Sequence, residues 1–315
     1  MMRENETRVS EFLLQGLRVP TERQGLCFIL FLFMYLTTVL GNLLIILLIR
    51  IDSRLHTPMY FFLSVLAFTD VTVSSVTVPK MLIDMKTNHK SIPYAGCISQ
   101  VFLLVVFVCF ENLLLTVMAY DRCVAICQPL HYTTIMRQER CIALVTTSLI
   151  LSFFYALMHT LLLARVSFCA NITIPHFFCE IIPILEISCS DVSLNLQVIY
   201  FVGGISFYLP FISILGTYIC IWATVLKNPS AKKFFKVLST CGSHLLVVSL
   251  FYGTILKVYF LSSSSATNNK DIIASVMYMI VTPMLNPFIY SLRNRDIKQA
   301  LNLLANRVKF CSQRT

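Results

Sequence analysis

The stretch ISQVFLLVVFVCFENLLLTVMAY, residues Ile98–Tyr120, carries one charged residue, Glu111, in a run of mostly apolar side chains. Asp121 and Arg122 follow it directly, and apolar residues then resume. About 20 largely apolar residues are enough to cross the hydrocarbon core of a bilayer. The stretch is therefore predicted to be a membrane-spanning helix with an adjacent acid and base at one end.

Six other stretches have the same character. Charged residues make up only 13% of the chain, whereas soluble domains carry about 25%. One of the six stretches, Thr57–Pro79, contains a single acid, Asp70. The other five contain no charged residue: Leu26–Ile49, Cys141–Ala164, Val192–Leu226, Val237–Leu256 and Ile272–Leu292. The sequence therefore predicts an all-α membrane protein, a seven-transmembrane helix bundle.

A single domain is expected over the 315 residues. We expect an N-terminal tail at residues 1–24, the helix bundle at 25–292, and a short amphipathic helix with its tail at 293–315. In the last segment, apolar residues recur at the spacing of one helix face: Ile297, Ala300, Leu301 and Leu304. This spacing is typical of a helix that lies along a membrane surface.

The basic residues predict the orientation. Fifteen of the 25 Lys and Arg residues lie on one side of the predicted bundle, with only four acids. Positively charged loops face the cytoplasm, so we expect a multi-pass plasma-membrane protein with its N-terminus outside. Residues 1–24 lack the apolar core of a signal peptide, so the first helix should insert uncleaved. The positive charge then faces the anionic lipid of the inner leaflet, and nucleic acid is not expected as a partner.

Two glycosylation sequons and four cysteines fall on the side predicted to be outside. The sequons begin at Asn5 and Asn171, and Asn5, in a tail expected to be free, is the better candidate. The cysteines are Cys97, Cys169, Cys179 and Cys189. An even number in an oxidising compartment indicates disulfides. Four cysteines permit three pairings, and the residues alone do not choose between them.

Asp70 and Glu111 lie near the middle of their predicted helices, where an ionisable residue is costly and usually functional. One interpretation is that one or both of them are protonated and hydrogen-bonded to neighbours such as Asn42, Ser74 or Asn286. The other is a shared site for a small hard cation such as sodium, which prefers oxygen ligands. Both interpretations remain open, and no other cofactor is expected.

Proline interrupts two predicted helices, at Pro210 and Pro287. Proline removes a helical hydrogen bond and kinks the helix, which membranes tolerate where neighbours satisfy the freed carbonyl groups. In TPMLNPFIY, Thr282–Tyr290, Asn286 precedes the second of two prolines. This segment is predicted either to deform during function or to hold a static kink.

Motifs of catalysis are missing from the sequence. It contains no G-x-S-x-G, no metalloprotease-type histidine pair and no phosphate-binding glycine loop, so an enzyme is not expected. The helix patterns show no internal repeat, which argues against a typical transporter.

Several motifs together resemble those of rhodopsin-like G-protein-coupled receptors. Asp-Arg follows the helix at Ile98–Tyr120, and Asn-Pro-x-x-Tyr occurs at Asn286–Tyr290. Longer matches narrow the resemblance to the odorant receptor family, in its larger, tetrapod-type class. These are HTPMYFFLS (His56–Ser64), PKML (Pro79–Leu82), MAYDRCVAIC (Met118–Cys127), PLHY (Pro129–Tyr132), HFFCE (His176–Glu180), STCGSH (Ser239–His244) and PMLNPFIYSLRN (Pro283–Asn294).

The resemblance implies particular disulfides. The family's usual bridge would join Cys97 to Cys179, and a second bridge within the same loop would join Cys169 to Cys189. A bridge between Cys97 and Cys189 remains the competing assignment. A loop held in this way would form a lid over the ligand pocket. The two intramembrane acids match the family's sodium-type site.

The mechanism that the resemblance implies is an agonist-driven shift between two states. Its switch would comprise Asp121, Arg122, Tyr218, Asn286, Pro287 and Tyr290. At rest, Arg122 would pair with Asp121 and with polar groups of the helix at Val237–Leu256. Agonist would favour an outward swing of that helix, with Tyr218 and Tyr290 supporting the open form. The implied partner is the stimulatory olfactory G protein, which raises cyclic AMP.

Ligand is expected in the outer half of the bundle, on the inward faces of the helices. Helical spacing selects Leu104, Val105, Val108, Cys109, Asn112, Val202, Gly203, Ser206, Tyr252, Ile255, Tyr259 and Met279. For each of them, ordinary helix packing is the alternative. The set is apolar with a few hydroxyl groups, which suits a small hydrophobic volatile held mainly by shape. Leu104 stands where related amine receptors carry an acid, so a cationic amine is disfavoured.

The sequence departs from the family pattern at three positions. Cys123 replaces a usual tyrosine, Leu149 a usual tryptophan, and Val65 a frequent asparagine. Cys123 lies beside Arg122, so we expect it to alter basal activity or coupling. Two rival functions remain open, a membrane transporter and a related receptor for a non-volatile metabolite or peptide.

Overall fold

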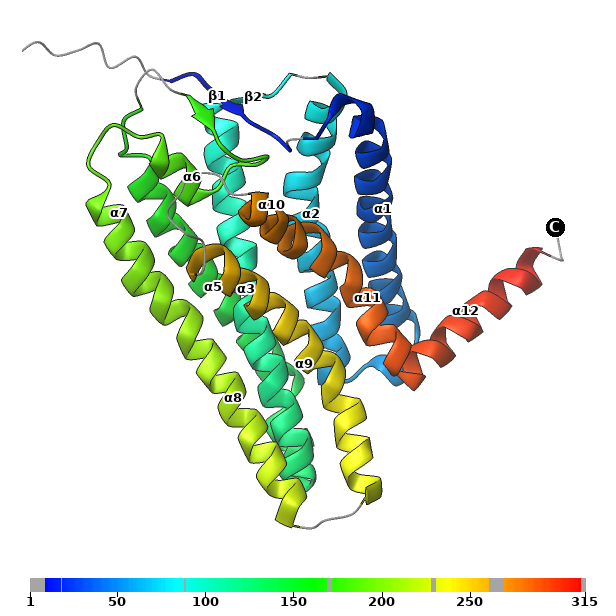
Figure 1. Ribbon diagram of the computed structural model, residues 1–315. Coiled ribbons are helices and arrows are strands. Elements are labelled where there is room, and N and C mark those ends of the chain that lie inside the picture. Colours follow the sequence, from blue (N-terminus) through cyan, green and yellow to red (C-terminus); the bar gives the residue numbers. More distant parts are fainter. Residues whose placement is uncertain are drawn as a thin grey trace, which may run out of the picture.

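Six helices in the computed structural model are long and apolar enough to cross a membrane, and a seventh contains a shorter apolar stretch, Cys241–Lys257. The structure describes residues 9–17, 19–87, 89–168, 172–227, 231–260 and 269–312. The helices pack side by side in one bundle (Figure 1). This arrangement confirms the predicted all-α seven-helix fold.

The helices of the bundle follow one another along the chain. The first four are α1 (Thr21–Ile51), α2 (Pro58–Thr87), α3 (Tyr94–Cys127) and α5 (Gln138–Leu163). The last three are α7 with α8 (Ser193–Val198, Gly204–Lys227), α9 (Ala231–Phe260) and α10 with α11 (Asn269–Val276, Thr282–Arg293). The fifth and the seventh each contain a π-helical turn, Ile199–Gly203 and Met277–Val281. Shorter helices are Ser53–Leu55, Pro129–His131, α4 (Tyr132–Ile135), α6 (Ile181–Glu186) and the C-terminal α12 (Arg295–Ser312).

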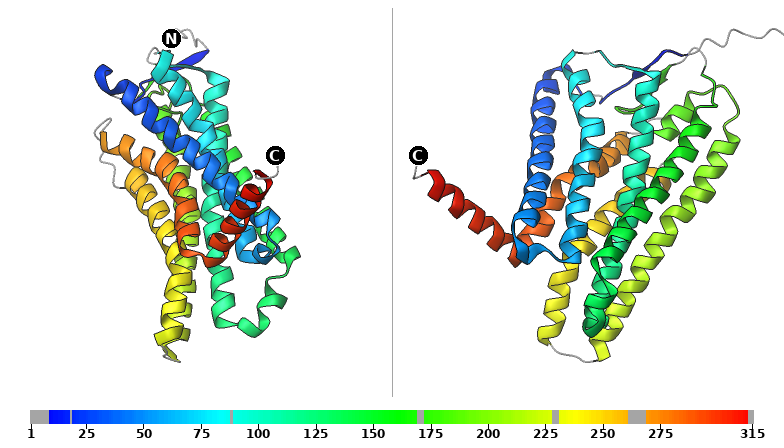
Figure 2. Two further views of the ribbon diagram at one scale, coloured as in Figure 1. Left: turned by 90° about the vertical axis from the view of Figure 1, so that its right-hand side faces the viewer. Right: turned by 180° about the vertical axis from the view of Figure 1, so that it is seen from behind.

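α3 lies at the centre of the bundle and packs against α2, α5 and α8 (Figure 2). Its interior side chains Leu114, Leu115 and Met118 are fully buried. α1 lies at the rim and exposes apolar side chains such as Leu26 and Phe33, as expected of a face that meets lipid. The central position of α3 explains why the polar residues of this helix are buried.

α2 and α3 each run at least seven residues past their predicted ends. α2 continues past Pro79, because proline removes only one helical hydrogen bond and Met81 beyond it still packs into the core. α3 includes Asp121 and Arg122 and ends at Cys127, because both charged residues lie between neighbouring helices and are buried.

A three-stranded sheet covers one end of the bundle, which we call the sheet end. The opposite end is called the Arg122 end. β1 (Glu11–Leu14) is the central strand. It pairs antiparallel with β2 (Ser91–Pro93), which precedes α3, and parallel with β3 (Thr173–Ile174), in the loop after α5. The N-terminal segment thus joins two loops that are far apart in the sequence.

Part of the N-terminal tail, which we expected to be free, is therefore built into the fold, because residues 11–14 form β1. Phe12 and Leu14 are 0% and 2% exposed, and the alternating Glu11 and Leu13 are exposed. The buried pair packs with Cys97 and other apolar residues beneath the sheet. Burial of alternate side chains on one face of the strand stabilises this segment, although the sequence of the N-terminal tail is largely polar.

Truncation of Phe12 to alanine is expected to destabilise the protein by about 3–5 kcal/mol, because a fully buried aromatic ring leaves a cavity when it is removed. The matched control is Leu13→Ala, since Leu13 is 41% exposed on the other face of the same strand. Thermal unfolding of detergent-solubilised protein measures both variants. Equal effects of the two substitutions would show that β1 does not pack as described.

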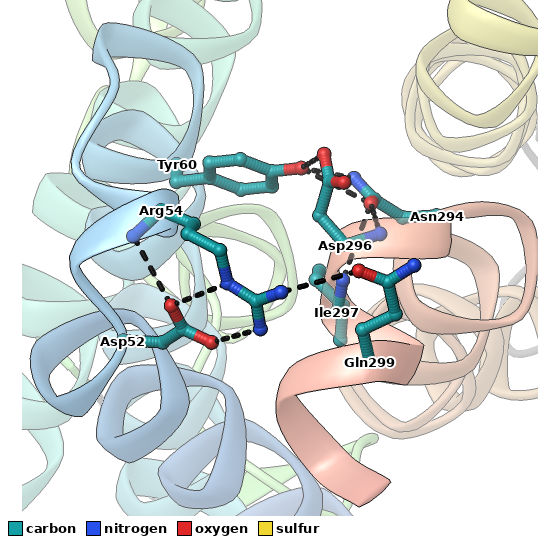
Figure 3. Close-up of polar contacts among 7 residues, drawn as sticks. All are labelled: Asp52, Arg54, Tyr60, Asn294, Asp296, Ile297 and Gln299. Carbon is teal, nitrogen blue, oxygen red and sulfur yellow. Dashed lines mark hydrogen bonds and ion pairs between the residues drawn. The ribbon is translucent and has the colours of Figure 1, made fainter. Parts of the chain in front are cut away.

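α12 begins at the Arg122 end and turns away from the bundle (Figure 1). Asn294 caps it, because its Oδ1 accepts the N–H groups of Asp296 and Ile297 at 2.9 and 3.3 Å. The Tyr60 hydroxyl of α2 accepts from Asn294 Nδ2 at 2.8 Å and donates to Asp296 Oδ2 at 2.9 Å (Figure 3). These bonds tie the start of α12 to α2.

Candidate functional site

A cavity of about 170 Å³ lies towards the sheet end, among α3, α5, the α7–α8 helix and α9. The wall from α3 and α5 consists of Val101, Leu104, Val105, Val108, Cys109, Asn112, Tyr155 and His159. The loop after α5 and the start of α6 contribute Phe178, Cys179, Glu180, Ile181 and Ile182. The remaining wall is Ile199, Tyr200, Gly203, Gly204, Ser206, Phe207, Phe251, Ile255 and Tyr278. The cavity is mostly apolar with a few polar groups, which is the usual composition of a small-molecule site.

Eight of the twelve residues selected by helical spacing lie on this wall: Leu104, Val105, Val108, Cys109, Asn112, Gly203, Ser206 and Ile255. Their role in ligand binding stays a prediction. Tyr252 lies behind the wall and donates its hydroxyl hydrogen to Asn112 Oδ1. The side chain of Tyr259 lies outside the described residues.

Two of the twelve point elsewhere. Val202 is 38% exposed on the outer side of the bundle, and Met279 is fully buried in a core cluster without lining the cavity. Each lies in a π-helical turn. A π turn contains an extra residue, which shifts the side chains away from the regular helical spacing. The neighbouring Tyr278 lines the cavity instead of Met279.

Sequence reasoning missed the contributions of α5 and of the loop that follows it. Tyr155 and His159 lie on α5, where neither a charge nor a proline drew attention. The segment Phe178–Ile182 contains Cys179, and the bridge implied for this cysteine already predicted a lid over the pocket. No spacing rule applies to a loop, so the residues that face the cavity depended on the folded structure.

The disulfide between Cys97 and Cys179 is present, which confirms the implied bridge and excludes one between Cys97 and Cys189. The Cys179 N–H also donates to Gln100 Oε1 at 2.8 Å. Both links fix the loop to α3, so the outer wall of the cavity is held in place. Cys189 is disulfide-bonded, but its expected partner Cys169 lies outside the described residues. Asn5 and Asn171, the two sequons, lie outside them as well.

His176 is buried in the same loop, in contact with the rings of Phe177 and Phe178. Its Nε2 lies 3.9 Å from a carboxylate oxygen of Glu180. Burial lowers the pKa of His176 to about 4, because a charged imidazole loses its hydration there. The desolvation outweighs the attraction of Glu180 at that distance, so His176 is neutral at pH 7.

Mild acid is expected to weaken this loop. The pKa of His176 is about 4 in the folded loop and 6.5 in its ordinary state, so the unfolded state binds the proton first. Stability is therefore lost as the pH falls below about 6.5, by about 1 kcal/mol at pH 5.5. Unfolding temperatures at pH 7.5 and 5.5 test this for wild type and His176→Phe. His176→Phe should lose less stability than wild type between pH 7.5 and pH 5.5. An equal loss in the two proteins would contradict the role of His176.

Four of the six predicted switch residues lie towards the Arg122 end: Asp121, Arg122, Tyr218 and Tyr290. The Tyr132 hydroxyl of α4 donates to Asp121 Oδ1 at 2.9 Å. Asp121 and Arg122 are not among the ion pairs of the described residues, and Arg122 Nε is buried without a hydrogen-bond partner there. The expected Arg122–Asp121 pair is thus replaced by a bond to the following loop, because α4 brings a phenol against the carboxylate.

Tyr218 and His244 connect three helices near the same site. The Tyr218 hydroxyl of α8 lies 2.7 Å from His244 Nδ1 of α9. The other ring nitrogen of His244 lies 3.1 Å from the Leu115 carbonyl oxygen of α3. Tyr290 is 3% exposed, and its hydroxyl has no partner among the described residues. The hydrogen-bond chain across α3, α8 and α9 holds these helices together in this state.

The polar residues in the middle of the bundle are also brought together. The Asn286 Nδ2 amide donates to both carboxylate oxygens of Asp70, at 3.0 and 2.9 Å. Glu111 is likewise buried, at 6% exposed. Asn42 donates to the Pro283 carbonyl oxygen at 3.2 Å. That bond contributes to satisfying the interrupted backbone of α11.

The three departures from the family pattern occupy different surroundings. The Cys123 Sγ lies 3.9 Å from the Cys127 Sγ, one turn further along α3. Leu149 is 41% exposed on α5, and Val65 packs partly buried against the main core. The effect of Cys123 on basal activity stays a prediction.

A seven-helix membrane bundle with a ligand-sized cavity towards one end and a buried Asp-Arg pair near the other has the architecture of a membrane receptor. The olfactory receptor family model matches residues 31–307. Olfactory receptor 1J4 of Homo sapiens is 62% identical over 313 residues, which cover 99% of this chain and 100% of that protein. Olfactory receptor 1J21 of Mus musculus is 57% identical over 312 residues, with 99% and 100% covered.

The chain therefore belongs to the olfactory receptor family. Members of this family are G-protein-coupled receptors for odorants and are not enzymes. The membership also makes this chain a multi-pass membrane protein.

Proposed function

We propose that this receptor binds a small, neutral, hydrophobic volatile in the cavity near the sheet end and activates a stimulatory, olfactory-type G protein, which raises cyclic AMP. The receptor works in the plasma membrane with its sheet end outside. The observation that carries the proposal is the apolar cavity closed by the loop that Cys97 and Cys179 anchor.

The size and chemistry of the cavity support this ligand class. Its volume of about 170 Å³ is close to that of an engineered cavity of about 150 Å³ that binds benzene. Leu104, Val105, Val108 and Ile255 supply apolar surface. The polar wall residue Asn112 already donates to the Ser206 carbonyl oxygen, at 2.9 Å. A compact hydrocarbon frame therefore fits better than an ion.

Activation is a shift of population between two arrangements of the Arg122 end. A ligand shifts that balance only by binding one arrangement more tightly than the other. The Tyr252 hydroxyl bonds to Asn112 on the cavity wall, and His244, which precedes Tyr252 in α9, bonds to Tyr218. α9 therefore contacts both the ligand cavity and the switch, and its movement would connect the two.

A cyclic AMP screen against a chemically diverse volatile library tests the proposal in cells that express a stimulatory olfactory G protein. We expect at least one neutral volatile to give a saturable, receptor-dependent rise. Activation by aqueous metabolites or peptides alone would favour the rival receptor function. Uptake of a labelled solute without any cyclic AMP response would favour a transporter.

We also propose that Asp70 and Glu111 contribute to an allosteric sodium site. Both acids are buried, and Asn286 orients the Asp70 carboxylate, whose oxygens are suitable ligands for a hard cation. Replacing sodium with choline in the medium is expected to shift the concentration of agonist that gives half-maximal response. Asp70→Asn should remove the shift. A wild-type response that does not depend on sodium would contradict the site.

A further inference from the structure

Two polar side chains of α5 line the cavity one helical turn apart. The rings of Tyr155 and His159 meet edge to face with centroids 4.5 Å apart. His159 is 4% exposed, and its Nε2 is buried without a hydrogen-bond partner in the described part of the chain. The Tyr155 hydroxyl also makes no hydrogen bond to any described residue. The pair thus presents unused hydrogen-bonding capacity at the cavity wall.

Two other polar residues of the wall, Asn112 and Ser206, already make hydrogen bonds. Asn112 uses both ends of its amide, donating to the Ser206 carbonyl oxygen and accepting from Tyr252. Ser206 donates its hydroxyl hydrogen to the Val202 carbonyl oxygen at 2.7 Å. A ligand would have to break these bonds to use the same groups. At Tyr155 and His159, by contrast, the ligand would form hydrogen bonds without breaking any bond to a described residue.

We infer that Tyr155 and His159 form the subsite for the polar head of the ligand, and that the ligand is a neutral molecule with an accepting oxygen at one end and a hydrocarbon body. Aldehydes, ketones, esters and alcohols are of this class. The inference rests on the proposed function. A tyrosine hydroxyl donates to such an oxygen, and a neutral imidazole offers one donor and one acceptor. The body of the ligand packs on the apolar wall from α3 and α9, such as Val105 and Ile255.

Gly203 keeps the space beside the Tyr155 hydroxyl open. A Cβ at this position would lie 3.2 Å from the hydroxyl oxygen, within the distance at which a ligand oxygen would be expected. Gly203→Ala is therefore expected to fill the head-group position. Gly216 lies further along α8 and has nothing within 4 Å of an added Cβ. Gly216→Ala is thus the matched control for a glycine substitution in the fifth helix.

The test compares oxygen-containing probes with matched hydrocarbons. Cyclic AMP dose–response curves are measured for octanal, 2-octanone and octane, and for carvone and limonene, among wider pairs of the same kind. Wild type should respond to oxygenated members at concentrations at least about fivefold below the matched hydrocarbon, since one net hydrogen bond has that effect. Tyr155→Phe and His159→Phe should each weaken the oxygenated response about five- to tenfold and leave the hydrocarbon response unchanged. Gly203→Ala should weaken it at least as much.

Two controls separate recognition from folding. Tyr208→Phe, on an exposed part of α8, and Gly216→Ala should behave as wild type. Surface receptor is measured for every variant. For a variant with little surface receptor, thermal stabilisation of the solubilised protein by each probe replaces the cellular assay, because a bound ligand raises the unfolding temperature.

The outcomes are distinct. Equal potency of hydrocarbons and oxygenated partners on wild type would overturn the subsite and leave the odorant function intact. Equal weakening of both probe classes by Tyr155→Phe and His159→Phe would also overturn it, because the pair would then act only by shaping the cavity. A wild type that responds to no volatile of either class would contradict the proposed function itself.

Discussion

Arg122→Ala is expected to abolish the cyclic AMP response while the receptor still reaches the cell surface. Arg122 lies near the C-terminal end of α3 and is 5% exposed. Its Nε has no hydrogen-bond partner among the described residues. Asp121 is held by the Tyr132 hydroxyl, so truncation of the arginine leaves no described partner unsatisfied. A residue that makes no hydrogen bond to the described residues in this arrangement, but has a buried guanidinium available to another arrangement, is suited to act in the active state.

The measurement is cyclic AMP over the full agonist range at matched surface expression. Arg140 is an exposed arginine at the same end of the bundle, so Arg140→Ala is the matched control and should retain most of the response. Retained signalling by Arg122→Ala would refute the switch role. Loss of the variant from the surface would indicate that Arg122 supports the fold.

Cys97→Ser is expected to remove most receptor from the surface and, in what remains, the odorant response. The bridge closes a loop with a sequence separation of 82, for which chain entropy predicts up to about 4–5 kcal/mol. The membrane already restricts the unfolded chain, so the actual loss should be smaller. Cys179 also lines the cavity, and without the bridge the loop no longer holds the outer wall.

A double variant tests whether Cys97 and Cys179 act through their common disulfide bond. Cys97→Ser, Cys179→Ser and the two together should have nearly the same effect, because each removes the same single bond. Cys27 is a free cysteine in α1, and Cys27→Ser should resemble wild type. Additive losses from the two bridge cysteines would mean that each acts separately, and normal expression and response would mean that the bridge is dispensable.

The bundle itself was predictable because crossing a bilayer places a simple demand on a sequence. Apolar stretches of about 20 residues form helices in lipid, where the backbone must satisfy its own hydrogen bonds. That demand is local, so the seven helices could be placed from composition alone. Glu111 and Asp70 stood out for the same reason, since a charge in such a stretch is conspicuous. The bridge between Cys97 and Cys179 needed the family resemblance, because four cysteines alone allow several pairings.

The cavity wall was predicted most fully where the helices are regular. Spacing on α3 placed Leu104, Val105 and Val108 correctly on the wall, because that helix runs unbroken from Tyr94 to Cys127. Spacing failed at Met279, in a π-helical turn. The turn shifts the side chains around the helix axis, and its presence is not marked by any residue pattern.

What the sequence by itself determined is the part governed by local chemistry: seven apolar helices, the intramembrane acids and the Asp121-Arg122 pair at the end of a span. Only the tertiary structure decided the long-range pairings. Phe12 is buried because loops from elsewhere in the chain form strands on either side of it. Asp121 binds Tyr132 rather than Arg122 because the following loop folds back against α3. Such contacts depend on distances between segments, and neither periodicity nor composition records those distances.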